Sequence, residues 1–246
     1  MAAGETSPLR HGVFPTTSWS DILAAGRQSP GSGEALAKLC AAYWSPTYAY
    51  IRRRGFPRES AEDLTQQFFA HVLENGFLSG AQRERGKFRS FLLTSVRNFL
   101  MNQWDSTQAQ KRGGHCVTFS LDFANAEGRY HREPSHELTP EVLFEREWAY
   151  ALLDRVLGRL RAEYAGKGQS AYFDRWKPYL YGDQDRGAYR ATAVELEMSD
   201  AAVKTAVYRF RQRYAGLLRE EIGATVTKPE EIDEEIRSLL AAMGAA

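Results

Sequence analysis

Hydrophobic residues recur at helical spacing over most of the chain. The clearest run falls at intervals of three and four between residues 88 and 100, and comprises Phe88, Phe91, Leu92, Val96, Phe99 and Leu100. This spacing places the side chains on one face of an α-helix. Similar patterns predict helices over 35–43, 48–54, 61–73 and 149–164, and no stretch alternates as a strand would. The chain is therefore predicted to be all-α.

Local signals suggest where two of these helices begin. Pro46 is expected to separate the 35–43 helix from the 48–54 segment, since proline interrupts helical hydrogen bonding. Ser60 is expected to cap the next helix, with Asp63 at the third position of a capping-box variant.

A second pattern lies between residues 188 and 215. A short helix is followed by Glu197-Met198-Ser199 and by a longer helix from Asp200 to about Tyr214, with Ser199 as its N-cap. Polar and basic residues fill the free face of the longer helix: Lys204, Thr205, Tyr208, Arg209, Arg211 and Gln212. Two helices with a short turn and a basic second helix indicate a helix-turn-helix motif. An ordinary helical hairpin remains the alternative, because Glu197 replaces the usual turn glycine.

The free face of the 88–104 helix is also polar. It carries Thr94, Arg97, Asn98 and Asn102, and it follows the basic, glycine-interrupted stretch 83–89. Cations with neighbouring aromatic rings suit single-stranded or melted nucleic acid, because rings stack on bases and cations neutralise phosphates. The alternative is that the aromatic residues here only build a core.

The charge of the 246-residue chain is unevenly distributed. Its net charge of +1 divides into +5 for residues 1–112, −4 for 113–148, +5 for 149–219 and −5 for 220–246. Basic modules favour a polyanionic partner. With the helical patterns, this division predicts a flexible arm (1–16), a helical domain (17–112), an irregular acidic linker (113–147), a helix-turn-helix domain (148–223) and an acidic helical extension (224–246).

Composition argues against several classes of protein. No apolar run is long enough to span a membrane, no secretory leader is recognisable, and mean hydropathy is −0.48. Two cysteines and five histidines without ligand spacing predict no disulfide framework and no metal site. A catalytic constellation is also absent from the sequence, so we expect a cytoplasmic protein that is not an enzyme and uses no cofactor.

The ordered set of motifs resembles bacterial sigma-70 family sigma factors of the extracytoplasmic-function type, from about Pro15 to the C-terminus. Sigma region two is represented by the stretches 60–69, 86–92, 97–99 and 110–113, and region four by 188–221. Two positions depart from the family pattern. Gln67 stands where relatives often carry Glu, and Phe91 replaces the commoner Trp.

The resemblance implies partners and roles for individual residues. It implies that the largest-subunit clamp coiled coil of core RNA polymerase is bound by Glu62, Asp63, Gln66, Gln67 and Phe69. It implies that melted minus-ten promoter DNA is contacted by Arg89, Phe91, Thr94, Arg97, Asn98, Asn102, Lys111 and Arg112. The 204–213 helix would read the double-stranded minus-thirty-five element, and the linker would thread toward the RNA-exit channel. An anti-sigma factor would be a further partner of such a protein.

Three hypotheses stay open at this point. A helix-turn-helix regulator that binds DNA without polymerase is the alternative to a sigma factor. An adaptor whose basic faces bind acidic protein is a third class. Within the sigma hypothesis, the acidic helix after Thr227 either folds back on region four and limits DNA access or simply completes its core.

Overall fold

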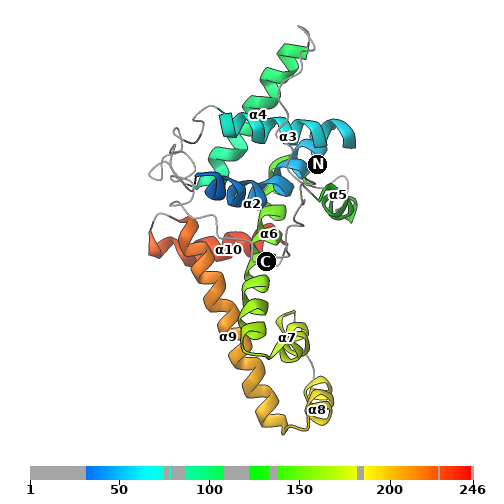
Figure 1. Ribbon diagram of the computed structural model, residues 1–246, viewed down its shortest axis with the longest axis vertical. Coiled ribbons are helices and arrows are strands. Elements are labelled where there is room, and N and C mark those ends of the chain that lie inside the picture. Colours follow the sequence, from blue (N-terminus) through cyan, green and yellow to red (C-terminus); the bar gives the residue numbers. More distant parts are fainter. Residues whose placement is uncertain are drawn as a thin grey trace, which may run out of the picture. The chain divides into compact units, whose positions relative to one another are not determined.

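The computed structural model describes residues 32–74, 78, 87–107, 122–132, 138–181, 186–226 and 228–244. All regular elements in these ranges are helices, which confirms the all-α prediction (Figure 1). They are α2 (Ser32–Arg53), α3 (Arg58–Glu74), α4 (Phe88–Thr107), α5 (Phe123–Arg132), α6 (Pro140–Gly166), α7 (Ser170–Trp176), η3 (Lys177–Leu180), α8 (Arg186–Glu195), α9 (Asp200–Thr225), η4 (Pro229–Glu231) and α10 (Ile232–Ala242).

The described chain forms two compact units. The smaller unit spans Arg155–Leu217 and is named the helix-turn-helix unit after the predicted motif that it contains, and the larger unit contains the described residues up to Asp154 and from Leu218 onward. The larger unit therefore includes the described parts of both the expected linker (113–147) and the expected extension (224–246). The arm expected at 1–16 lies outside the described residues.

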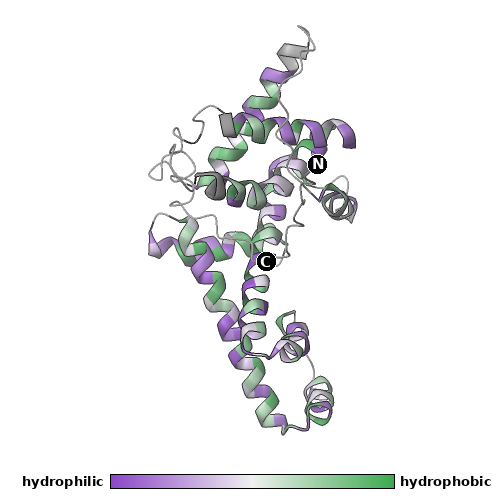
Figure 2. Cartoon of the chain, in the orientation of Figure 1, coloured by the Kyte–Doolittle hydropathy of each residue, from purple (hydrophilic) through white to green (hydrophobic). Residues whose placement is uncertain are grey.

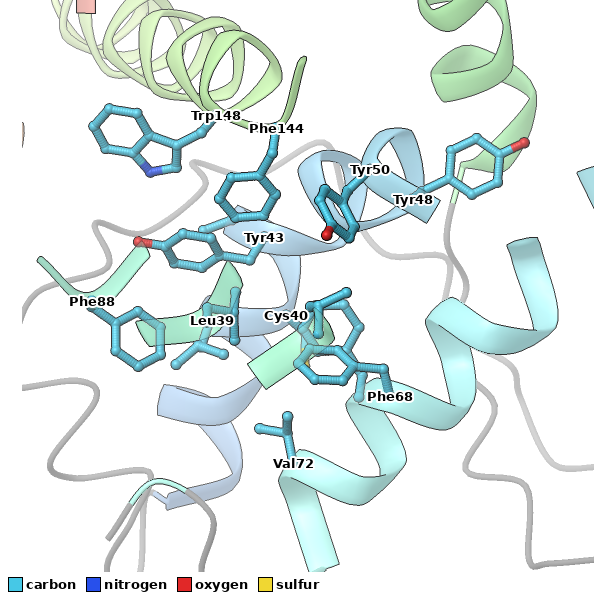
Figure 3. Close-up of a cluster of buried hydrophobic side chains, with 14 of the residues drawn as sticks. Leu39, Cys40, Tyr43, Tyr48, Tyr50, Phe68, Val72, Phe88, Phe144 and Trp148 are labelled. Atoms are coloured by element: carbon cyan, nitrogen blue, oxygen red, sulfur yellow. The ribbon is translucent and has the colours of Figure 1, made fainter. Parts of the chain in front are cut away.

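Aromatic side chains dominate the core of the larger unit (Figure 3). Tyr43 of α2 meets Phe88 of α4 edge to face, with 5.4 Å between ring centroids. Phe68 of α3 packs in the same way on Phe99 of α4 at 5.6 Å. Trp148 of α6 is 2% exposed in the same cluster. The periodic face of the 88–100 sequence thus supplies core contacts to α2 and α3, as the pattern predicts.

Helix α2 runs through Pro46 without interruption, so the expected break there is wrong. Proline removes one backbone donor, but the neighbouring Tyr43, Thr47 and Tyr48 are all buried. Burial of these side chains on one continuous helix outweighs the missing hydrogen bond. The helix ends instead at Arg53, just before Gly55, whose φ of +95° is a left-handed conformation that glycine adopts without strain.

Helix α3 begins three residues earlier than expected, at Arg58. The Ala61 N–H donates to the Pro57 carbonyl at 2.9 Å, so the helical hydrogen bonds start before Ser60. Ser60 therefore lies inside the first turn and is not the N-cap.

The expected irregular linker contains helix α5, which packs on α2. Glu127 of α5 is 6% exposed and accepts hydrogen bonds from Arg52 Nε at 3.0 Å and Arg52 Nη2 at 2.7 Å. The Tyr48 hydroxyl also donates to Glu127. Burial opposes ionisation of Glu127, but these donors outweigh it and lower the pKa of the carboxyl. A single carboxylate thus anchors a segment that the composition alone describes as a loop.

Removing this charge will destabilise the larger unit in a pH-dependent way. Glu127→Gln is expected to lower the free energy of unfolding by about 3 kcal/mol at pH 7, because Arg52 loses its buried partner. The folded-state pKa lies below the unfolded one, so this stabilisation is present above the unfolded pKa of about 4.3. The difference from wild type should shrink as pH falls below about 4. Urea unfolding of wild type and variant at several pH values measures this difference in the free energy of unfolding. An equal loss of stability in the exposed control Glu59→Gln would contradict the role of Glu127.

The helix-turn-helix unit has its own small aromatic core. Phe210 of α9 is fully buried between Tyr164 of α6, at a centroid distance of 5.4 Å, and Phe173 of α7, at 5.9 Å. Arg213 of α9 forms an ion pair with Glu163 of α6 (Nε to Oε2, 2.9 Å), and its hydrogen bond is the main cause that lowers the pKa of Glu163. These contacts orient the first half of α9.

The C-terminal helix α10 lies in the larger unit together with the end of α9 from Leu218 onward. It contacts that end of α9, which falls within the predicted 148–223 domain: Arg219 forms an ion pair with Asp233, and Ile232 lies beside Gly223. Whether α10 limits DNA access stays a prediction. Leu239 is 2% exposed in the same core as Phe88 and Trp148, with Ile232 and Ile236 packed alongside. The apolar stripe of α10 therefore packs in the core of the larger unit, which also contains Ile222 and Val226.

Candidate nucleic-acid interface

The turn between α8 and α9, the predicted helix-turn-helix segment, is short and well defined. The Met198 N–H donates to the Ala193 carbonyl at 2.9 Å, and the Glu197 N–H donates to the Val194 carbonyl at 3.3 Å, which ends α8 in a Schellman-type turn. Glu197 adopts a φ of 52°, the left-handed conformation in which glycine is common. The position therefore retains the backbone of a turn glycine, although the residue is Glu.

Ser199 caps α9 as predicted. Its hydroxyl oxygen accepts the Ala202 N–H at 3.2 Å, and its carbonyl accepts the Val203 N–H at 3.0 Å. Asp200, the first helical residue, adds a negative charge at the positive end of the helix dipole. The start of α9 is thus defined by local chemistry.

Helix α9 separates a buried face from a solvent face. Val203, Val207 and Phe210 are at most 1% exposed. Hydrophilic and hydrophobic residues are correspondingly interleaved along the helix (Figure 2). Five of the predicted DNA-contacting residues are exposed together on the solvent face: Lys204, Thr205, Tyr208, Arg209 and Gln212. Tyr208 is 62% exposed, a large ring that core packing does not explain.

Arg211, the sixth predicted residue on α9, points into the unit. Its Nε donates to the Tyr179 carbonyl at 2.8 Å. The Tyr179 hydroxyl in turn donates to the Ala188 carbonyl at 3.0 Å and lies 2.7 Å from the Thr192 hydroxyl on α8. Tyr179 therefore joins both helices of the motif, and Arg211 positions α9 through it.

The sequence offered only a general signal for Tyr179. It lies in an aromatic segment between residues 172 and 181. An aromatic run indicates packing, but the partner of a particular hydroxyl depends on which helix folds beside it.

Helix α4 presents a second polar face, in the larger unit. Thr94, Arg97, Asn98 and Asn102 are exposed. Thr94 Oγ1 donates to its own helix at the Ser90 carbonyl, 2.9 Å away. Phe91 is half-buried and packs on the core, so only part of its ring reaches the surface. Lys111 and Arg112 lie outside the described residues.

Arg89 does not belong to this exposed face, and its predicted contact with DNA is corrected here. It is 7% exposed, with Nε 2.5 Å from Glu145 Oε2 and a further ion pair to Glu235. Its guanidinium lies 4.3 Å from the Trp148 ring centroid. Burial disfavours the charge, but both carboxylates outweigh it and raise the pKa of Arg89. Arg89 lies next to the buried Phe88 on α4, and its burial depends on Glu145 and Glu235, which are distant in the sequence.

Helix α3 and α4 together form a groove in the larger unit. Its volume is about 380 Å³, and it is lined by Phe56, Ser60, Asp63, Leu64, Gln67, Leu100 and Gln103. Asp63 and Gln67 are exposed at this groove, and Gln103 Nε2 lies 3.4 Å from Gln67 Oε1. An apolar floor with a polar rim is suited to binding a protein segment.

The other predicted polymerase contacts on α3 lie differently. Glu62 forms an ion pair with Arg58 at 2.8 Å, and Gln66 is half-buried. Phe69 is 1% exposed, with its ring centroid 5.4 Å from that of Phe68, so its predicted contact with a partner is corrected to a core role. Both rings of the Phe68-Phe69 pair belong to the core cluster of the larger unit.

Other kinds of site are not seen in the part of the chain that the structure describes. Within it, His, Cys, Asp and Glu side chains do not gather in a group of three that would hold a metal ion. The helices described there are all too short or too polar to cross a membrane. Cys40 is buried, and burial raises the pKa of its thiol to about 12.

Comparisons with known proteins add no information about this site. No family model, curated protein or solved structure matches this chain.

The left-handed Glu197 offers a test of the turn. Glu197→Gly is expected to raise the free energy of unfolding by about 0.5–1 kcal/mol, since glycine relieves the side-chain clash of this conformation and loses part of the gain to unfolded-state entropy. Glu197→Val should lower it by about 1 kcal/mol, because a β-branched residue tolerates positive φ poorly. Urea unfolding followed by circular dichroism measures both, and equal effects of the two substitutions would rule out the strained turn.

Proposed function

We propose that this chain is a sigma-type transcription initiation factor, which binds core RNA polymerase and directs it to promoters. The observation that carries the proposal is the α8–α9 motif, with its left-handed turn at Glu197, its Ser199 cap and an exposed polar face on α9. A helix with such a face fits the major groove, where Arg, Lys and Gln recognise base edges. In this proposal α9 reads the minus-thirty-five element.

The larger unit supplies the second half of the proposed function. Arg97, Asn98 and Asn102 offer hydrogen-bond donors along one exposed face of α4. Donors of this kind can recognise the edges of unpaired bases, while Arg97 neutralises phosphate. In the proposal this face holds the melted minus-ten element.

The groove between α3 and α4 is the proposed docking site for polymerase. Asp63 and Gln67 line it together with Leu64 and Leu100. An antiparallel coiled coil presents polar and apolar side chains at helical spacing, which complements such a surface. Two weak DNA contacts on one polymerase-bound chain would then act together through their high effective concentration.

Replacement of Arg209 tests the recognition helix. Arg209→Ala is expected to weaken binding to a selected promoter duplex by about 1–3 kcal/mol, or roughly 5- to 150-fold, if the guanidinium contacts a base. Arg219→Ala removes the same charge ten residues further along α9 and serves as the matched control. Fluorescence anisotropy at constant salt measures both affinities. Indifference to Arg209, with normal folding, would refute recognition by this face.

Replacement of groove residues tests the sigma function itself. Asp63→Ala with Gln67→Ala is expected to weaken binding to core polymerase by about 2 kcal/mol, near 30-fold, as central interface residues commonly do. Glu59→Ala, an exposed carboxylate of α3 outside the groove, is the control. Polymerase pull-down and run-off transcription provide the readouts.

The same experiment distinguishes a sigma factor from the two alternative functions. A stand-alone helix-turn-helix regulator would bind promoter duplex but would not be retained by core polymerase. An adaptor would be retained by an acidic protein and would give no DNA crosslinks from α4. Polymerase-dependent run-off transcripts are expected only for a sigma factor.

A further inference from the structure

The C-terminal helix α10 carries a buried acid. Glu235 is 1% exposed, and its two carboxylate oxygens form ion pairs with Lys87 and Arg89 at the start of α4. A carboxylate is removed from water only where cations compensate its lost hydration. The position of Glu235 is therefore set by these two cations as much as by the helix that carries it.

The charges around Glu235 balance only when α10 is docked. Arg89 also pairs with Glu145 of α6, so the cluster holds two cations and two carboxylates. Removal of Glu235 would leave one positive charge in excess. Lys87, whose side chain is 41% exposed, could then present that charge to solvent. An anion from outside would find a cation there that α10 now neutralises.

Helix α10 buries few apolar side chains. Among its apolar residues only Leu239 is almost fully buried, while Ile232 and Ile236 are half-buried and Leu240 is 41% exposed. An 11-residue helix is not stable alone in water, so α10 is helical because it is docked. Its contacts with the larger unit therefore govern both its structure and the exposure of the cations beneath it.

We infer that α10 is an autoinhibitory element: through Glu235 it neutralises Lys87, beside the buried Arg89, and competes with the phosphates of single-stranded DNA for the Lys87 ammonium. The inference rests on the proposed function, since it assigns α4 to nucleic acid. It places the regulation on the larger unit, and α9 can bind duplex DNA whether or not α10 is docked.

The first test changes charge alone. Glu235→Gln is expected to bind a single-stranded oligonucleotide about five- to tenfold more tightly at 0.1 M salt, with a log–log salt slope steeper by about 0.7 for the extra phosphate. Glu234→Gln, an exposed neighbour on the same helix, removes the same charge and controls for net charge. Equal affinities of the two variants would overturn the inference.

The second test changes packing alone, and it covers the case in which Glu235→Gln folds poorly. Ile236→Ala should loosen α10 and raise single-strand affinity, whereas Leu240→Ala, on the exposed side, should not. Hydrogen exchange of residues 232–242 should also accelerate when the oligonucleotide is added to wild type. Unchanged protection with DNA bound would make α10 a purely structural part of the core and would overturn the inference.

The outcome is independent of the proposed role of α9. Duplex binding that depends on Arg209, together with single-strand binding that ignores Glu235, would refute autoinhibition and leave the promoter-recognition proposal standing. If duplex binding did not depend on Arg209 and single-strand binding did not depend on Glu235, both the promoter-recognition proposal and autoinhibition would be refuted.

Discussion

The burial of the Arg89 guanidinium is the constraint on which the larger unit depends. A charge that is 7% exposed must have counter-charges, and Glu145 and Glu235 supply them from residues 56 and 146 positions away. The Trp148 ring covers the same group at 4.3 Å. The start of α4, the first turns of α6 and the C-terminal helix therefore meet at one side chain. Loss of either carboxylate would leave a buried charge undercompensated.

In the helix-turn-helix unit, a polar aromatic residue and not a buried ion pair holds the helices together. Its geometry depends on one polar aromatic residue, Tyr179, which contacts α8 through its hydroxyl and α9 through its carbonyl. Phe210 fixes α9 against α6 and α7 by aromatic packing. The contacts of Tyr179 and Phe210 both involve the buried face of α9, so Lys204, Arg209 and their neighbours on the opposite face are exposed. The side chains that hold α9 in place and those proposed to bind DNA therefore lie on different faces of one helix.

Local patterns predicted much of this arrangement. The helical periodicity from Phe88 to Leu100, the Ser199 cap and the division of α9 into two faces all follow from residues within about one or two turns of each other. The exposed part of the candidate site could be found in the same way, because exposure of Lys204 or Asn98 requires only that the opposite face be buried. Its assignment to DNA remains a prediction that chemistry supports.

By itself, the sequence determined most of the helical stretches and which helix faces are polar, because both are properties of neighbouring residues; helix α5 and the continuity of α2 through Pro46 were not determined in this way. Only the tertiary structure decided that Arg89 and Phe69 are core residues, that Arg211 holds Tyr179, and that α5 and α10 pack on the larger unit. Each of these depends on a partner distant in the chain, which local spacing does not specify.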